Sequence, residues 1–300
     1  MTRRSILTTL CLVACTLPAC DAPGAVPPEG SGAAEDMAEP EPHADSPADD
    51  GEDADKNDCK PAPAALPRVM FVLDKSSSMT NTGKESGWAA EDDGPSRWAQ
   101  LHTLVGALAD GMEGEAAMGA VLFPSTYAEA AGEAVCDVRA VPEAAVGPYR
   151  AADLMGLLPP ADAEEFLGGS PAQAAYATAL DHLETLGGPA PTAIVLITDG
   201  GINCADDAAP LDRADDDLAE LVAFARDSLQ IQTFVIGVGV APGDQLVPNG
   251  DPDAALREIA LAGGAANGER GYFTFSERLP LVSALNSFVR PVDAAATACR

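Results

Sequence analysis

Residues 68–79 read RVMFVLDKSSSM, and this stretch decides the fold of the chain. Its first half is a short apolar run bounded by Pro67, which is typical of a fully buried strand in a parallel sheet. Asp74 stands where the strand leaves the core, and Ser76 and Ser78 follow it. Loops at the carboxyl ends of parallel strands form the ligand crevice of such sheets, so these side chains are expected in a binding site. Hard oxygen ligands predict a divalent cation there, Mg²⁺ first, with Ca²⁺ or Mn²⁺ as alternatives.

Two later segments also place polar residues at the ends of expected helices or strands. Residues 167–183 read LGGSPAQAAYATALDHL, in which Ser170, Pro171 and Gln173 match an N-cap, a first-turn proline and a capping box. A helix is therefore expected to begin at Ser170. Residues 193–199 read AIVLITD, a second continuous apolar strand that ends in Asp199 and precedes two glycines.

The spacing Asp-x-Ser-x-Ser after an apolar strand resembles the metal-ion-dependent adhesion site of von Willebrand factor type A domains. In that family a Gly-rich loop delivers a threonine to the metal, and the matching residue here is Ser170, which keeps the hydroxyl. A helix cap alone is the other interpretation of Ser170. Asp199 matches the third metal loop. The resemblance implies a cation site with one position left for a partner's carboxylate, formed by Asp74, Ser76, Ser78, Ser170 and Asp199.

Strand and helix patterns alternate along residues 68–290. This alternation predicts an α/β fold with a doubly wound, mostly parallel open sheet and helices on both faces, as in Rossmann-like folds. The resemblance also implies the strand order 3-2-1-4-5-6, which places the strand before Asp199 beside the strand before Asp74.

The N-terminal region has the pattern of an exported lipoprotein. Residues 1–19 carry Arg3 and Arg4, a short apolar stretch and the ending Leu-Pro-Ala, as in a signal peptide that precedes a lipidated Cys20. Residues 20–67 are acidic and rich in Pro, Gly and Ala, which predicts a solvated tether before a domain at 68–300. We therefore expect a lipid anchor in the outer membrane, facing the periplasm or the exterior, as the only membrane contact; simple secretion is the alternative.

The net charge of the chain limits the kinds of partner it can bind, and its cysteines indicate the compartment. A formal net charge of −30 argues against nucleic acid as a partner. Besides Cys20, four cysteines remain in the domain and tether, and in an exported protein two disulfides are expected, Cys59–Cys299 and Cys136–Cys204. A zinc site is the alternative, although no pair shows the close spacing of zinc ligands.

Three functions are compatible with the sequence. The preferred one is a binding module that uses its cation to capture a protein or another ligand through a carboxylate. A passive envelope protein with a stabilising metal is the second, and a metal-dependent hydrolase the third. No catalytic residue is expected, because the histidines, His43, His102 and His182, fall in the tether and on helices, outside the predicted loops.

Overall fold

The structure is a computed structural model, and it describes residues 65–80, 94–125, 136–163, 166, 168–204, 217–240 and 251–289. All of them lie in the second of the two units into which the chain divides, Asn57–Arg300. The expected signal peptide, the tether, Cys20 and the Cys59–Cys299 pair lie outside the described residues. No helix in the described ranges is long and apolar enough to cross a membrane.

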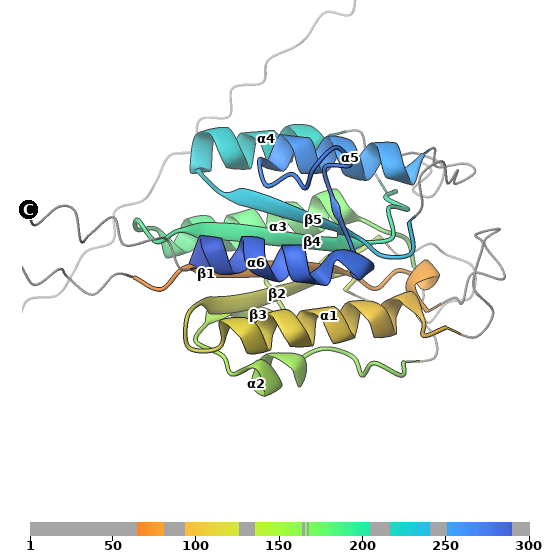
Figure 1. The fold of residues 1–300 in the computed structure, drawn as a ribbon, viewed down its shortest axis with the longest axis horizontal. Helices are drawn as coiled ribbons and strands as arrows, with labels where there is room; N and C mark the ends of the chain where they lie inside the picture. The colour runs from red at the N-terminus through yellow and green to blue at the C-terminus, as the bar shows by residue number, and fades with distance from the viewer. Residues whose placement is uncertain are drawn as a thin grey trace, which may run out of the picture. The chain divides into compact units, whose positions relative to one another are not determined.

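Strands and helices alternate as the sequence pattern predicts (Figure 1). The strands are β1 (Arg68–Asp74), β2 (Ala117–Phe123), β3 (Ala144–Gly147), β4 (Thr192–Thr198), β5 (Gln232–Gly237) and β6 (Phe273–Thr274). The helices are α1 (Arg97–Met112), α2 (Ala151–Met155), α3 (Ala172–Leu186), α4 (Leu218–Leu229), α5 (Pro252–Gly263) and α6 (Arg278–Val289). Two short 3₁₀ turns, η1 (Ser77–Met79) and η2 (Phe275–Glu277), follow β1 and β6.

The strands form one sheet in the order β3-β2-β1-β4-β5-β6, which confirms the predicted order. All neighbouring strands run parallel except β3, which pairs antiparallel to β2 at the edge. β1 and β4 are central, with Leu73 opposite Ile197 in the register. This register brings Asp74 beside Thr198, the last residue of β4, at the crevice where the strand order reverses.

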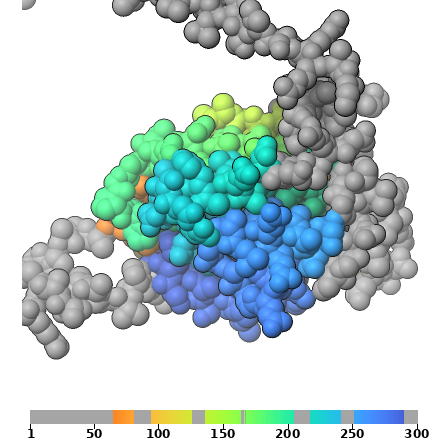
Figure 2. Space-filling view, turned by 90° about the horizontal axis from the view of Figure 1, so that it is seen from above, coloured from red at the N-terminus to blue at the C-terminus, as the bar shows by residue number. Residues whose placement is uncertain are grey.

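Each face of the sheet packs against its own layer of helices. The side chains of β1 alternate between the layers, with Val69, Phe71 and Leu73 in one apolar cluster and Met70 and Val72 in the other. The first cluster includes residues of α1, α2 and α6, and the second includes residues of α3, α4 and α5. Figure 2 shows α4 in cyan and α5 in blue side by side on the outside of the second layer. Burial on both faces explains why the central strands are continuous apolar runs.

Most helix boundaries agree with their local signals. Asp251 caps α5 by accepting a hydrogen bond from the Ala254 N–H, Pro252 begins the helix, and Gly264 ends it at a φ of +76°. α1 runs through Gly111 and ends at Met112, and Gly114, at a φ of +76°, is the glycine that leaves the helix.

One predicted helix start is wrong. α3 begins at Ala172 with Pro171 at its N-cap, and the Ser170 side chain does not cap it. At the C-terminal end, Thr274 forms a capping box with Glu277 before α6. α6 turns Leu279 outward, with 76% of that residue exposed.

Candidate functional site

Asp74 lies at the centre of a buried polar cluster at the carboxyl ends of β1 and β4. Its Oδ2 atom accepts hydrogen bonds from the Ser170 hydroxyl at 2.9 Å and from the Thr198 hydroxyl at 2.6 Å. Its Oδ1 atom accepts the Ser76 N–H at 2.8 Å, which closes a tight turn directly after β1. The Asp74 carboxylate is fully buried, so these contacts fix its position and orientation.

The first loop places its serines side by side. The Oγ atoms of Ser76 and Ser78 lie 3.1 Å apart. Ser76 is 3% exposed, whereas Ser78 is more accessible. Because Ser78 is accessible, the candidate site is open to solvent on its side. The loop is also joined to the Ser170 segment by a hydrogen bond from the Ser77 N–H to the Gly168 carbonyl at 3.2 Å.

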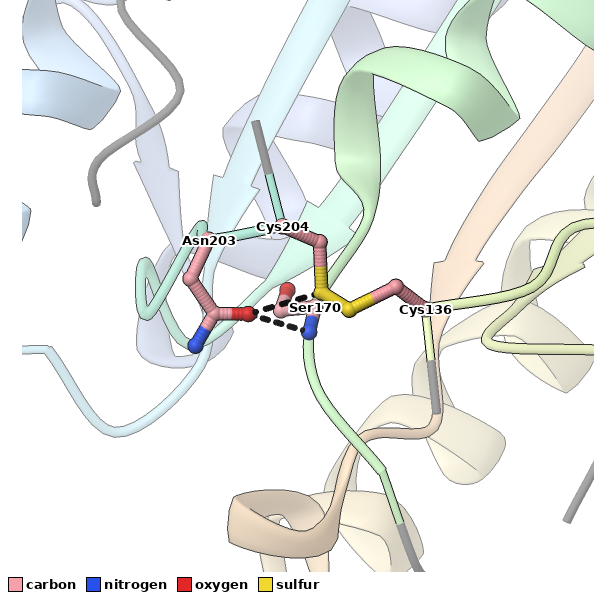
Figure 3. The surroundings of a disulfide bond; sticks show 4 residues. All are labelled: Cys136, Ser170, Asn203 and Cys204. Carbon is pink, nitrogen blue, oxygen red and sulfur yellow. Dashed lines mark hydrogen bonds between the residues drawn. A yellow bond between two sulfur atoms is a disulfide. The ribbon is translucent and has the colours of Figure 1, made fainter. Parts of the chain in front are cut away.

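The second loop is held by two hydrogen bonds with Asn203, of which Figure 3 shows the one to the Asn203 side chain. The Asn203 Oδ1 atom accepts the Ser170 N–H at 2.7 Å, and the Asn203 N–H donates to the Ser170 carbonyl at 3.1 Å. These two bonds fix the backbone of Ser170. Its hydroxyl does not cap α3 and instead donates to Asp74. The next residue, Cys204, forms the predicted disulfide with Cys136, with a Cα–Cα distance of 5.8 Å.

The third loop contributes Asp199, which is also fully buried. Its Oδ1 atom accepts the Gly201 N–H at 3.2 Å, and its Oδ2 atom accepts a hydrogen bond from the Arg97 guanidinium at 3.1 Å. The same Arg97 nitrogen donates to the Ser78 carbonyl at 3.2 Å. Arg97, the first residue of α1, thus links the first loop to the third.

The pKa of Asp74 reflects its burial beside a second carboxylate. Burial, and then the nearby Asp199 carboxylate, raises the pKa of Asp74 to about 7. The hydrogen bonds from Ser76 and Thr198 act in the opposite direction but are outweighed. A cation placed among these oxygens would favour the charged form of Asp74.

The donor set fits a hard divalent cation. Two carboxylates and several hydroxyls from three loops lie in one buried cluster, and all are oxygen ligands of the type that Mg²⁺ and Ca²⁺ take. Within the described ranges no group of three or more His, Cys, Asp and Glu side chains could hold a metal. A cation at this site would therefore depend on the serines for much of its coordination.

The sequence pattern predicted that the three loops lie together, but it did not indicate three further residues that contact them. Thr198 could have been found from its place at the end of β4, opposite Asp74 across the parallel pairing. Arg97 is the first residue of α1, and Asn203 stands in a loop without a regular pattern. Nothing local in the sequence indicates the long-range contacts of these last two residues.

The chain was compared with known proteins. No family model matches it, and no curated protein does. Among solved structures, one form of the pilus adhesin SpaC from Lactobacillus rhamnosus GG matches with a TM-score of 0.51 and 15% identity, over 77% of this chain and 31% of the adhesin. Its open conformation matches with a TM-score of 0.50 and 12% identity, over the same shares of the two chains. The PilB minor pilin from Streptococcus sanguinis gives a TM-score of 0.46 and 14% identity, over 77% of this chain and 63% of the pilin.

These findings correct the assignment to the von Willebrand factor type A family. No family model supports it, and the similar structures with a TM-score of 0.50 or more are those of a pilus adhesin. The Asp-x-Ser-x-Ser motif does not identify a family, because it reflects local geometry. The Ser76 N–H closes a turn on Asp74, and the doubly wound topology brings the strand ends together. The similarity to SpaC, which spans about a third of the adhesin's length, shows a shared fold.

Proposed function

We propose that the domain is a binding module of the cell envelope that holds a divalent cation at the Asp74 cluster and captures ligands through a carboxylate. The proposed ligands of the cation are Asp74, Ser76, Ser78, Ser170 and Asp199. The observation that carries the proposal is the convergence on Asp74, whose Oδ2 atom contacts hydroxyls from two other segments: that of Ser170, before α3, and that of Thr198, at the end of β4.

The arrangement of charges supports capture of an anionic oxygen. When bound, a divalent cation would supply a Lewis-acidic centre that accepts further oxygen ligands. The cluster's own two carboxylates neutralise such a charge in the buried interior, and the serines add neutral oxygens. Ser78 is the most exposed of the five residues, so we place the approach of the ligand on its side of the cluster.

The location and the adhesive role are part of the same proposal. The export and lipidation pattern of residues 1–20 favours a protein anchored in the envelope. The fold that the domain shares with a part of SpaC, a pilus adhesin, is compatible with adhesion. The proposed partner is a protein or another ligand that offers a carboxylate.

The experiment uses acetate as the simplest carboxylate and acetamide as its neutral counterpart. Backbone amide signals of Gly200 and Gly201, which adjoin Asp199, are followed by NMR while each is added to the full chain with Mg²⁺ or with EDTA. We expect shifts with acetate only in Mg²⁺, and none with acetamide. Mg²⁺ binding without any response to acetate would contradict ligand capture and favour a cation that only stabilises the loops.

A further inference from the structure

Arg97 is a fixed positive charge inside the candidate site. It is 8% exposed, and its Nη1 atom lies 3.1 Å from Asp199 Oδ2 and 3.2 Å from the Ser78 carbonyl oxygen. An arginine is rarely buried to this degree unless it is paired with a carboxylate. Here the partner carboxylate belongs to the same cluster that would hold the cation.

The loop after β5 leaves room for this side chain. A Cβ atom at Gly239 would lie 2.6 Å from Arg97 Nε, and Gly239 has a φ of +68° that other residues rarely adopt. The guanidinium is thus bounded by Gly239, Asp199 and the Ser78 carbonyl. This packing keeps Arg97 next to Asp199.

The charges of the cluster can be added up with Arg97 included. Asp74 and Asp199 supply two negative charges when ionised, and Arg97 supplies one positive charge. Lys75 and Glu143, which interact with each other beside Asp74, add one charge of each sign. Without Arg97, a divalent cation would leave the cluster neutral; with Arg97, the loaded cluster carries one positive charge. That surplus attracts an anion in a chain whose overall charge is −30.

We propose that Arg97 sets the ligand specificity of this site: it weakens binding of the divalent cation and strengthens binding of an anionic oxygen to the loaded site. The proposal rests on the proposed function, because it concerns the same cation and the same carboxylate. Arg97 acts through Asp199 and through its charge, so it is a positioning residue. Its signature is a pair of opposite effects, which the loss of a purely structural contact does not produce.

The test compares Arg97→Gln and Arg97→Lys with the wild-type full chain. Arg150→Gln is the matched control, because Arg150 is an exposed arginine that pairs with Asp153 on the surface. Mg²⁺ affinity is measured by calorimetry, and acetate affinity of the Mg²⁺-saturated protein by the NMR shifts of Gly200 and Gly201. Thermal unfolding with and without Mg²⁺ is recorded for each variant, since Arg97→Gln leaves Asp199 without its buried partner.

The expected result is opposite changes in Arg97→Gln. Mg²⁺ should bind on the order of tenfold more tightly and acetate on the order of tenfold more weakly, while Arg97→Lys and Arg150→Gln stay near wild type. If Arg97→Gln is less stable than the wild type without the cation, Mg²⁺ should raise its unfolding temperature by more than it raises that of the wild type.

Other outcomes separate the two proposals. If wild type and Arg97→Gln bind Mg²⁺ equally well, or if both affinities fall together in the variant, the role of Arg97 is refuted and the cation site stands. Mg²⁺ binding in Arg97→Gln but not in wild type would refute the cation site of the native chain while supporting the opposition between Arg97 and the cation. If neither binds Mg²⁺, both proposals are refuted.

Discussion

The hydroxyl of Ser170 donates a hydrogen bond to Asp74 Oδ2 across 2.9 Å, although 96 residues separate the two along the chain. The contact joins the loop after β1 to the segment that enters α3. It exists because the parallel sheet brings the carboxyl ends of its strands together and because Asn203 fixes the Ser170 backbone. The Ser170 side chain therefore contacts Asp74 and does not cap α3.

Replacing Ser170→Ala should lower Mg²⁺ affinity without weakening α3. The helix loses no cap, because Pro171 occupies the N-cap position and Ser170 makes no capping bond. The cation would lose one neutral oxygen, and we expect an affinity about tenfold lower, with unchanged helical circular dichroism. Ser287→Ala, an exposed serine whose hydroxyl bonds to the Ser283 carbonyl of its own helix, is the control. A loss of helical signal in Ser170→Ala would restore the capping role.

The disulfide should stabilise the domain. Cys136 and Cys204 are 68 residues apart, and a cross-link of that span contributes about 4 kcal/mol in the chain-entropy model. The double variant Cys136→Ala/Cys204→Ala should therefore unfold at a clearly lower denaturant concentration than wild type. Because Asn203 adjoins Cys204 and holds Ser170, the variant should also bind Mg²⁺ more weakly. Equal unfolding midpoints for the two proteins would show that the bond contributes nothing.

His182 should make the domain less stable in mild acid. Its Nε2 atom accepts the Val146 N–H at 3.0 Å, which requires the neutral imidazole, and burial lowers the pKa of His182 below the ordinary value of 6.5. Between the lowered pKa and 6.5 the unfolded chain binds more protons than the folded one. The contribution of His182 is thus present above 6.5 and is lost as the pH falls through the folded-state pKa.

The measurement is denaturant unfolding from about pH 7.5 to about pH 5. His102, whose pKa burial also lowers, contributes with the same sign, whereas the raised pKa of Asp74, about 7, contributes with the opposite sign. The effect of His182 is therefore the difference between the two proteins: as the pH falls, His182→Gln should lose less stability, or gain more, than wild type. The assignment to His182 fails if the two proteins show the same pH dependence.

The anchor at Cys20 remains a prediction from the sequence. Lipidation of Cys20 should place the protein in the membrane fraction, and Cys20→Ala should release a soluble protein with the same fold. Fractionation of cells that express each form, followed by immunoblotting, checks this. Retention of Cys20→Ala in the membrane would place the anchor elsewhere.

The sequence predicted the fold well because its signals were strong and local. The apolar runs before Asp74 and Asp199 are continuous, as strands buried on both faces must be, and β1 and β4 match them closely. Asp251, Pro252 and Gly264 delimit α5 with residue types that suit those positions alone. The length of the last strand, β6, is not set by such local signals, because at a sheet edge it depends on pairing with β5.

The site was predicted in outline and missed in its details. Asp74 and Asp199 end apolar strands, so their positions follow from topology. The Ser170 pattern indicated a helix cap, but a tertiary contact with Asp74 takes the hydroxyl instead. The contact of Arg97 with Asp199 joins residues 102 positions apart, and no local pattern encodes such a pair.

The most direct test of the account is a calorimetric titration of Mg²⁺ into the wild-type chain, Asp74→Ala and Asp199→Ala. It is done at about pH 8, where Asp74 is mostly ionised. Asp153→Ala, on the exposed surface of α2, is the control for loss of a carboxylate. The account predicts that wild type and Asp153→Ala bind Mg²⁺, and that the two site variants keep their circular dichroism but bind none. Wild-type affinity in both Asp74→Ala and Asp199→Ala would contradict the cation site and the capture of carboxylates that depends on it.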